Sequence, residues 1–105
     1  MQLDELRVYS CFRCGNIVSR QDDIVSTSFQ SGNHRAFLLS HAKNVLIGTE
    51  EEKELITGLH KVCDVYCSDC ELALGWMYVE AYSEDQKYKE GKVCLDQYKV
   101  LKQSL

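Results

Sequence analysis

The 105-residue sequence contains no proline, and none of its apolar runs approaches the ~18 residues that a membrane span needs. No Pro- or Ser-rich linker divides it, so we expect one compact domain over residues 1–105. Residues 1–10 carry acidic side chains where a secretory signal needs a basic and then an apolar stretch. We therefore expect an intracellular protein in a reducing compartment.

Positive charge is also scarce. The 12 Lys and Arg residues are outnumbered by 16 Asp and Glu, which gives a net charge of −4. Proteins that bind nucleic acid neutralise phosphates with clustered basic side chains, and anionic membrane surfaces attract the same residues. The composition therefore disfavours both partners.

Sequence patterns of common enzyme classes are missing as well. The chain contains no G-x-S-x-G, no Walker sequence, no G-x-G-x-x-G and no His-rich open metal site. We expect no enzymatic activity.

Cysteine, in contrast, is abundant, with six residues in a short chain. Four of them form two C-x-x-C pairs, Cys11/Cys14 and Cys67/Cys70, with 52 residues between the pairs. Two intervening residues allow a tight knuckle that brings both sulfurs to ~2.3 Å from one metal ion. Two such knuckles complete a closed Cys₄ shell, which predicts a structural Zn²⁺ site and would change the net charge from −4 to −6. The alternative is a set of reduced core cysteines.

Cys63 and Cys94 lie outside these pairs, within apolar runs. Free cysteine usually behaves as a small buried hydrophobe, so we expect both in the core. Two alternatives are that Cys63 competes as a metal ligand and that Cys94 is a reactive thiol beside Lys89 and Lys92.

Short runs rich in Val, Ile, Leu, Tyr and Phe alternate with turn signals, a pattern that predicts an antiparallel, mostly β domain. The expected strands are 6–10, 17–20, 24–29, 36–39, 43–47, 60–66, 74–82 and 92–100. Residues 49–55 could form a helix or a solvated loop, and residues 83–90 a polar turn. The lysine-rich run 87–92 is interpreted as a solvated hairpin edge.

Several motifs, taken together and in order, resemble the Yippee family. They are Phe29-Gln30, Arg35-Ala36-Phe37-Leu38, Thr57-Gly58-Leu59-His60, Leu74-Gly75-Trp76 and Gln86-Lys87-Tyr88-Lys89-Glu90-Gly91-Lys92, with both C-x-x-C pairs. The resemblance covers about residues 9–99, and Ser40-His41-Ala42 resembles plant members more than animal ones. Ala usually stands at the position of Cys63 in the family, which argues against a ligand role for that residue.

The resemblance implies a β-tent: two antiparallel sheets that meet at an angle and are pinned by one Cys₄ zinc. The thalidomide-binding domain of cereblon, Mis18 proteins and B-type methionine sulfoxide reductases share this architecture. It also implies a protein of the nucleus and cytoplasm with protein partners, linked to cell division or to ubiquitin-ligase assemblies. The reductase likeness keeps a thiol enzyme using Cys94 as an alternative.

Related domains place a ligand pocket on a sheet, away from the zinc. Trp76 and Tyr78 occupy the positions of two pocket aromatics of the cereblon domain, and His60 is a third candidate. A small-molecule sensor built around these residues is therefore a second candidate function. The chain has a single Trp, so a complete tryptophan cage is not expected.

Overall fold

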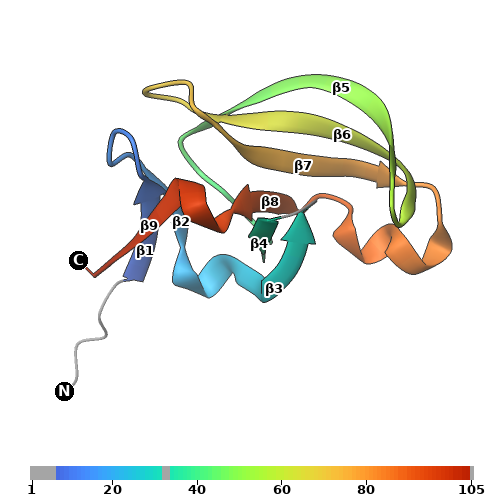
Figure 1. Ribbon diagram of the computed structural model, residues 1–105, viewed down its shortest axis with the longest axis horizontal. Coiled ribbons are helices and arrows are strands. Elements are labelled where there is room, and N and C mark those ends of the chain that lie inside the picture. The colour runs from blue at the N-terminus through green and yellow to red at the C-terminus, as the bar shows by residue number, and fades with distance from the viewer. Residues whose placement is uncertain (1–6, 32–33, 105) are drawn as a thin grey trace.

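A computed structural model describes residues 7–31 and 34–104 of the chain. Its described residues form nine strands in two antiparallel sheets. The smaller sheet has the order β2-β1-β9, with β1 at Arg7–Cys11, β2 at Ile17–Arg20 and β9 at Val100–Ser104. Figure 1 shows this sheet at one side of the molecule, turned relative to the larger one.

The larger sheet has six strands in the order β3-β4-β8-β7-β6-β5. Their bounds are Ile24–Ser31 (β3), His34–Leu39 (β4), Val45–Leu55 (β5), Gly58–Cys67 (β6), Ala73–Ala81 (β7) and Val93–Asp96 (β8). Three short 3₁₀ helices connect strands: Gln21–Asp23 (η1), Glu84–Lys89 (η2) and Gln97–Lys99 (η3). The mostly β fold with two antiparallel sheets is as the sequence predicts.

Apolar side chains gather in two clusters. The first joins the sheets and contains Tyr9, Val18, Leu39, Val65, Leu74, Val93, Leu95 and Val100 together with Cys11 and Cys67. The second lies within the large sheet and contains Ala36, Leu38, Val62, Tyr78 and Cys94, with Phe29, Leu55 and Trp76 packed against it. Because Met77 packs on the first cluster and Trp76 and Tyr78 on the second, β7 contributes to both.

Gly75 allows β7 and β8 to approach each other closely. A Cβ atom at this position would lie 1.8 Å from the backbone oxygen of Cys94, which is far inside van der Waals contact. The glycine of the Leu74-Gly75-Trp76 motif is therefore a packing requirement of the sheet.

Residues 49–55 are neither helix nor loop, so that prediction is wrong. They continue β5, which pairs with β6 from Val45↔Cys67 to Leu55↔Gly58 with one irregularity after Ile47. Backbone bonds along β6 outweigh the low strand propensity of glutamate. Lys61 on β6 also lies 3.9 Å from the carboxylates of Glu50 and Glu80 on the two flanking strands.

Two further boundaries differ from the sequence prediction. The expected strand 92–100 is divided into β8 and β9 by η3, because the chain passes from the large sheet to the small one at this point. Residues 84–89 form the helix η2, and Ser83 makes no side-chain capping bond. Leu6, the first residue of the expected strand 6–10, lies outside the described residues. No helix within 7–31 and 34–104 is long and apolar enough to cross a bilayer.

Candidate metal centre and aromatic pocket

The four cysteines of the two C-x-x-C pairs converge at one point between the sheets. Cys11 ends β1 and Cys67 ends β6, while Cys14 and Cys70 lie in the turns that follow. Their sulfur atoms all lie within 4.8 Å of one another. The Sγ atoms of Cys11 and Cys70 are 3.6 Å apart, and those of Cys14 and Cys67 are 3.5 Å apart. The two cysteine pairs, which are far apart in the sequence, therefore form one cluster in space.

The two turns repeat the same backbone geometry. The N–H of Gly15 donates to the carbonyl of Cys11 at 2.8 Å, and the N–H of Glu71 donates to that of Cys67 at 2.9 Å. Both residues adopt positive φ, +81° at Gly15 and +62° at Glu71. Glycine adopts this conformation readily, so the residue after the first pair suits the turn, whereas a glutamate after the second pair gives no such signal.

The sulfur arrangement fits one tetrahedral metal ion. Ligands at about 2.3 Å from a tetrahedral centre are separated by about 3.8 Å. The closest pairs, at 3.5 and 3.6 Å, are near this separation. A set of four thiols suits Zn²⁺ or an Fe–S centre and leaves no position for a substrate water. Because one knuckle comes from each sheet, an ion held here would connect the two sheets.

Asn16 supports the cluster and was not singled out by the sequence. Its amide donates to the Sγ of Cys67 at 3.3 Å and to the carbonyl of Asn44 at 3.0 Å. Burial raises the pKa of the Cys67 thiol, but hydrogen bonds from the backbone of Cys70 and from Asn16 outweigh it and lower the pKa to about 6. At its partner Cys14, a backbone hydrogen bond from Asn16 lowers the pKa, but burial and the neighbouring sulfurs outweigh it and raise the pKa to about 12. A bonded thiolate such as that of Cys67 is what a metal requires. An Asn two residues after a C-x-x-C pair is too common a pattern to predict such a contact.

The remaining cysteines are in the core, as predicted. Cys63 is 4% exposed and Cys94 is fully buried, and neither belongs to the four-sulfur cluster. Cys94 lies on β8, paired with Leu38 on β4 and with Trp76 on β7.

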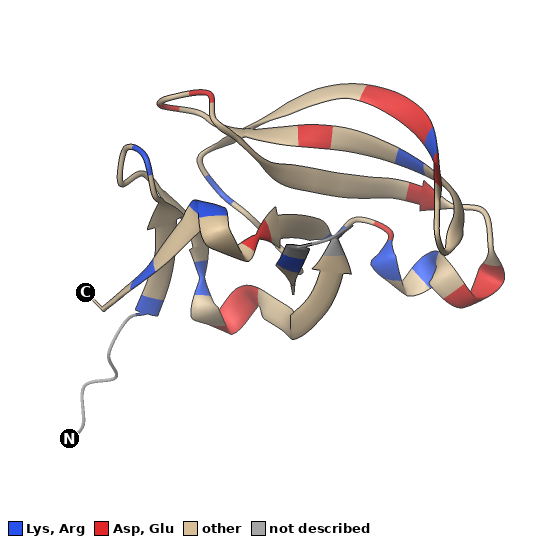
Figure 2. Cartoon of the chain, in the orientation of Figure 1, with Lys and Arg blue, Asp and Glu red and all other residues tan. Residues whose placement is uncertain are grey.

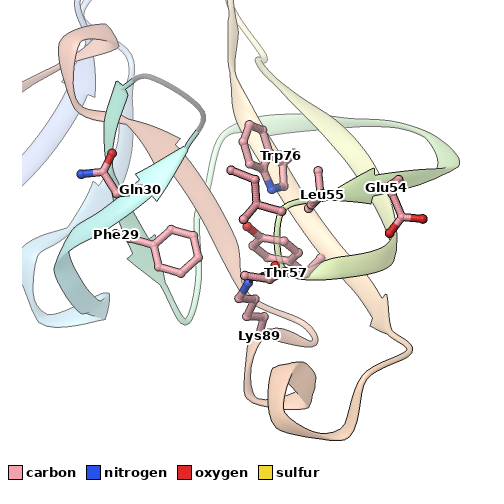
Figure 3. Close-up of a pocket in the computed structure, with 9 residues that line it drawn as sticks. Phe29, Gln30, Glu54, Leu55, Thr57, Trp76 and Lys89 are labelled. Atoms are coloured by element: carbon pink, nitrogen blue, oxygen red, sulfur yellow. Dashed lines mark hydrogen bonds between the residues drawn. The ribbon is translucent and has the colours of Figure 1, made fainter.

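An aromatic pocket of about 400 Å³ lies at the other end of the large sheet. Its lining is Phe29, Gln30, Glu54, Leu55, Ile56, Thr57, Trp76, Tyr78 and Lys89. Figure 3 shows Phe29 across the pocket from the Leu55 side, with Trp76 at one end and Lys89 at the other. The ring of Tyr78 contacts two of the other aromatic rings, with its centroid 6.2 Å from that of Trp76 and 6.2 Å from that of Phe29. Two of the three predicted pocket residues, Trp76 and Tyr78, are therefore in the lining.

His60, the third predicted pocket residue, is fully buried and does not line the pocket. Its ring packs against that of Tyr78, with 5.6 Å between the ring centroids. The Nδ1 atom is 2.8 Å from the carbonyl of Gly58. This position is that of a side chain that supports the aromatic wall.

Lys89 is the pocket residue that the sequence analysis assigned incorrectly. It lies in the run interpreted as a solvated edge, yet it is only 4% exposed. Its Nζ donates to Thr57 Oγ1 at 3.1 Å and lies 5.3 Å from the ring centroid of Tyr78. Burial lowers the pKa of this ammonium from its ordinary value of 10.5. The η2 helix turns Lys89 inward, a direction that a lysine-rich sequence does not reveal.

Acidic side chains are concentrated on one edge strand, β5. Figure 2 shows red segments along β5, where Glu50, Glu51, Glu52 and Glu54 lie next to Lys53, and further red and blue segments scattered over other elements.

Comparisons with known proteins agree with the fold and the metal cluster. A family model described as "Yippee zinc-binding/DNA-binding /Mis18, centromere assembly" matches residues 7–105. A yippee-like protein of Arabidopsis thaliana is 50% identical over 97 residues, which cover 92% of each chain. Yippee-like 3 proteins of Danio rerio and Homo sapiens are 44% and 43% identical over 96 residues, covering 91% of this chain and 81% of theirs.

Among solved structures, the crystal structure of a Mis18 "Yippee-like" domain superposes with a TM-score of 0.75. The match covers 95% of this chain and 97% of that one, at 20% sequence identity. At this identity the likeness establishes the fold alone. The family model and the sequence relatives, which match nearly the whole chain, show that the chain belongs to the Yippee-Mis18 family.

Proposed function

We propose that this protein is a non-enzymatic protein-interaction module whose two sheets are joined by one structural zinc ion. Cys11, Cys14, Cys67 and Cys70 would be the four ligands. The observation that carries the proposal is the convergence of their four sulfurs from both sheets into a cluster within 4.8 Å. The family description names zinc, and four thiolates form a closed shell around that ion.

A closed shell supports a structural role for the metal. Catalytic zinc keeps one position for water or substrate, and four cysteine ligands fill all positions. The alternative thiol nucleophile, Cys94, is fully buried between β4 and β7 and is not accessible to a substrate. These placements favour binding over catalysis.

The acidic surface suits protein partners better than nucleic acid, although the family description also names DNA binding. With zinc bound by four thiolates the net charge is −6, and the acidic side chains of β5 add a local negative field. We infer partners in the nucleus and cytoplasm, in assemblies of cell division or ubiquitin ligation. The words "centromere assembly" in the family description support a role in cell division.

Cobalt substitution tests the closed site. Co²⁺ reports its coordination by visible absorption, so the metal-free protein is titrated with Co²⁺ and then with azide or cyanide. We expect a four-thiolate tetrahedral spectrum that these ligands leave unchanged. A spectrum that shifts with azide would reveal an open position and would contradict a purely structural metal.

Crosslinking in native extracts tests the interaction role. The zinc-loaded protein and its Trp76→Ala variant are crosslinked in parallel, because the variant alters the pocket and leaves the outer strands intact. We expect a reproducible set of protein partners, retained by the variant where the contact is made by sheet edges. Recovery of no specific partner by either protein would contradict the proposal.

A further inference from the structure

The aromatic pocket contains a cation with few partners. Lys89 Nζ lies 5.4 Å from the ring centroid of Phe29, 5.3 Å from that of Tyr78 and 5.9 Å from that of Tyr88. An ammonium carries three N–H donors. Among the described residues its hydrogen bond goes to Thr57 Oγ1, and no carboxylate lies within ion-pair distance of it, although the negative charge of Asp85 on η2 acts on the ammonium from farther away. The ammonium therefore has donor capacity directed at the pocket.

A second donor belongs to the same pocket. The indole Nε1 of Trp76 is buried and makes no hydrogen bond of good geometry among the described residues, although it lies close enough to the Tyr78 hydroxyl to act on it. Buried N–H groups are nearly always paired in folded proteins. Trp76 and Lys89 line the pocket from opposite ends, so a ligand between them would lie against the indole of Trp76 and within reach of the Lys89 ammonium.

The remaining walls are mostly apolar, with Gln30 and Glu54 as the further polar residues of the lining. Phe29 comes from β3, Leu55 from β5 and Tyr78 from β7, and these side chains present flat or branched surfaces to the space. Glu54, the acidic residue of the lining, is exposed, and Figure 3 shows its carboxylate directed outward at the rim. A volume of about 400 Å³ is within the range of small-molecule sites.

Charge decides which class of molecule this pocket suits. Aromatic faces attract cations, but here those of Phe29 and Tyr78 already hold the ammonium of Lys89. A second cation would be repelled, whereas a carboxylate would gain a charge-assisted hydrogen bond. We propose that the pocket binds a small, flat carboxylate, with its anionic group at Lys89 and its apolar body between Phe29 and Trp76.

The unmodified protein provides a direct test, because Trp76 is its only tryptophan and gives one indole N–H resonance. The zinc-loaded, ¹⁵N-labelled protein is titrated with 2-naphthoate, with neutral 2-naphthamide and with the cation 2-naphthylmethylammonium. We expect the indole resonance to shift with naphthoate and the amide to bind at least about tenfold more weakly. The cation should cause no shift.

Acetyl-alanyl-phenylalanine is titrated in parallel as the second source of the same chemistry. It carries a ring and a carboxylate at a peptide C-terminus, whereas naphthoate represents a free acid. Tighter binding of either one identifies the source. Equal affinity for naphthoate and naphthamide, or no shift with any carboxylate, would overturn the proposal.

A matched pair of variants locates the anion. Lys89→Met keeps the aliphatic stem and removes the charge inside the pocket, whereas Lys102→Met removes an equal charge from exposed β9. We expect the first to weaken naphthoate binding at least about tenfold and the second to change it less than about twofold. Equal effects of the two variants would contradict a role for Lys89.

Two controls keep these outcomes interpretable. If Lys89→Met does not fold, the comparison of carboxylate and amide in the unmodified protein still decides the question. Zinc content is measured for every protein, since the pocket proposal does not depend on the zinc proposal. Failure of carboxylate binding in a chain that holds one zinc would overturn the pocket proposal and leave the zinc proposal standing.

Discussion

The two ends of the large sheet are held by different kinds of contact. At the end where β6 turns into β7, two knuckles bring four sulfurs together and connect the sheet to its smaller neighbour. At the opposite end, η2 is fastened to β7 by side-chain bonds. Glu90 Oε2 accepts the N–H of Ala81 at 3.0 Å, and Lys87 Nζ donates to the carbonyl of Ala81 at 2.8 Å.

The metal end is therefore expected to stabilise the whole fold, whereas the pocket end contributes less to stability. A metal centre contributes folding free energy directly, because the unfolded chain does not hold a formed site. Hydrogen bonds to a surface helix contribute little each. We therefore expect changes at the metal end to affect the whole domain and changes at the pocket end to act locally.

The largest effect is expected from removal of a ligand. Cys67→Ser should abolish tight zinc binding and cost more than about 5 kcal/mol, enough to unfold a small domain. Cys63→Ser is the matched control, because Cys63 is a buried cysteine on the same strand outside the cluster. Zinc analysis and circular dichroism check both variants. A folded Cys67→Ser protein with one zinc would contradict the assignment.

The second-largest loss of stability is expected from a substitution at Gly75, in the middle of the large sheet. Gly75→Ala would place a Cβ 1.8 Å from the Cys94 backbone oxygen, so β7 and β8 must separate. We expect a loss of roughly 3 kcal/mol in the free energy of unfolding, measured by urea denaturation. Gly48→Ala, whose nearest neighbours lie at 3.4 Å, should cost less than about 1 kcal/mol. Similar losses for both would show that the approach at Gly75 can relax.

The knuckles themselves predict a pair of opposite, smaller effects. Gly15→Ala introduces a side chain at φ +81°, and we expect a loss of about 1–2 kcal/mol. Glu71→Gly relieves the same conformation at φ +62° and should be neutral or stabilising. Urea denaturation of the zinc-loaded proteins measures both. Destabilisation by Glu71→Gly would break the equivalence of the two knuckles.

At the pocket end, Glu90 predicts a pH-dependent difference. The hydrogen bond from the Ala81 N–H lowers the pKa of the Glu90 carboxyl below its ordinary value of 4.5. Its stabilising effect is therefore complete above pH 4.5 and is lost as the pH falls through the folded-state pKa. Glu90→Gln should be less stable than the unmodified protein at neutral pH, and the difference should shrink below pH 4.5. A difference that is constant with pH would contradict this role.

The same comparison explains what the sequence could predict. A metal knuckle is encoded within four residues, so Cys11/Cys14 and Cys67/Cys70 are recognisable without knowledge of the fold. The pocket is assembled from β3, β5, β7 and η2, and no local pattern reports that Lys89 turns inward. Its charge predicted exposure, whereas the aromatic rings and Thr57 provide partners that only the fold brings together.

Strand β5 shows a second limit of the same kind. Residues 49–55 carry four glutamates, a composition that favours a helix or a loop, yet they pair with β6 along its length. Pairing with β6 determines the strand conformation of residues 49–55, because local propensity is weak compared with a ladder of backbone hydrogen bonds. Asn16 was missed for a related reason, because its contact with Cys67 spans 51 positions of the sequence.

The most direct test of the account is the metal content of the protein and its relation to folding. Native mass spectrometry of freshly purified protein measures the ion, and near-ultraviolet circular dichroism follows a strong chelator and then added Zn²⁺. We predict one zinc per chain, loss of the tertiary signal on chelation and its recovery with zinc. A metal-free chain that keeps an unchanged tertiary signal would contradict a fold held together by four cysteines and one ion.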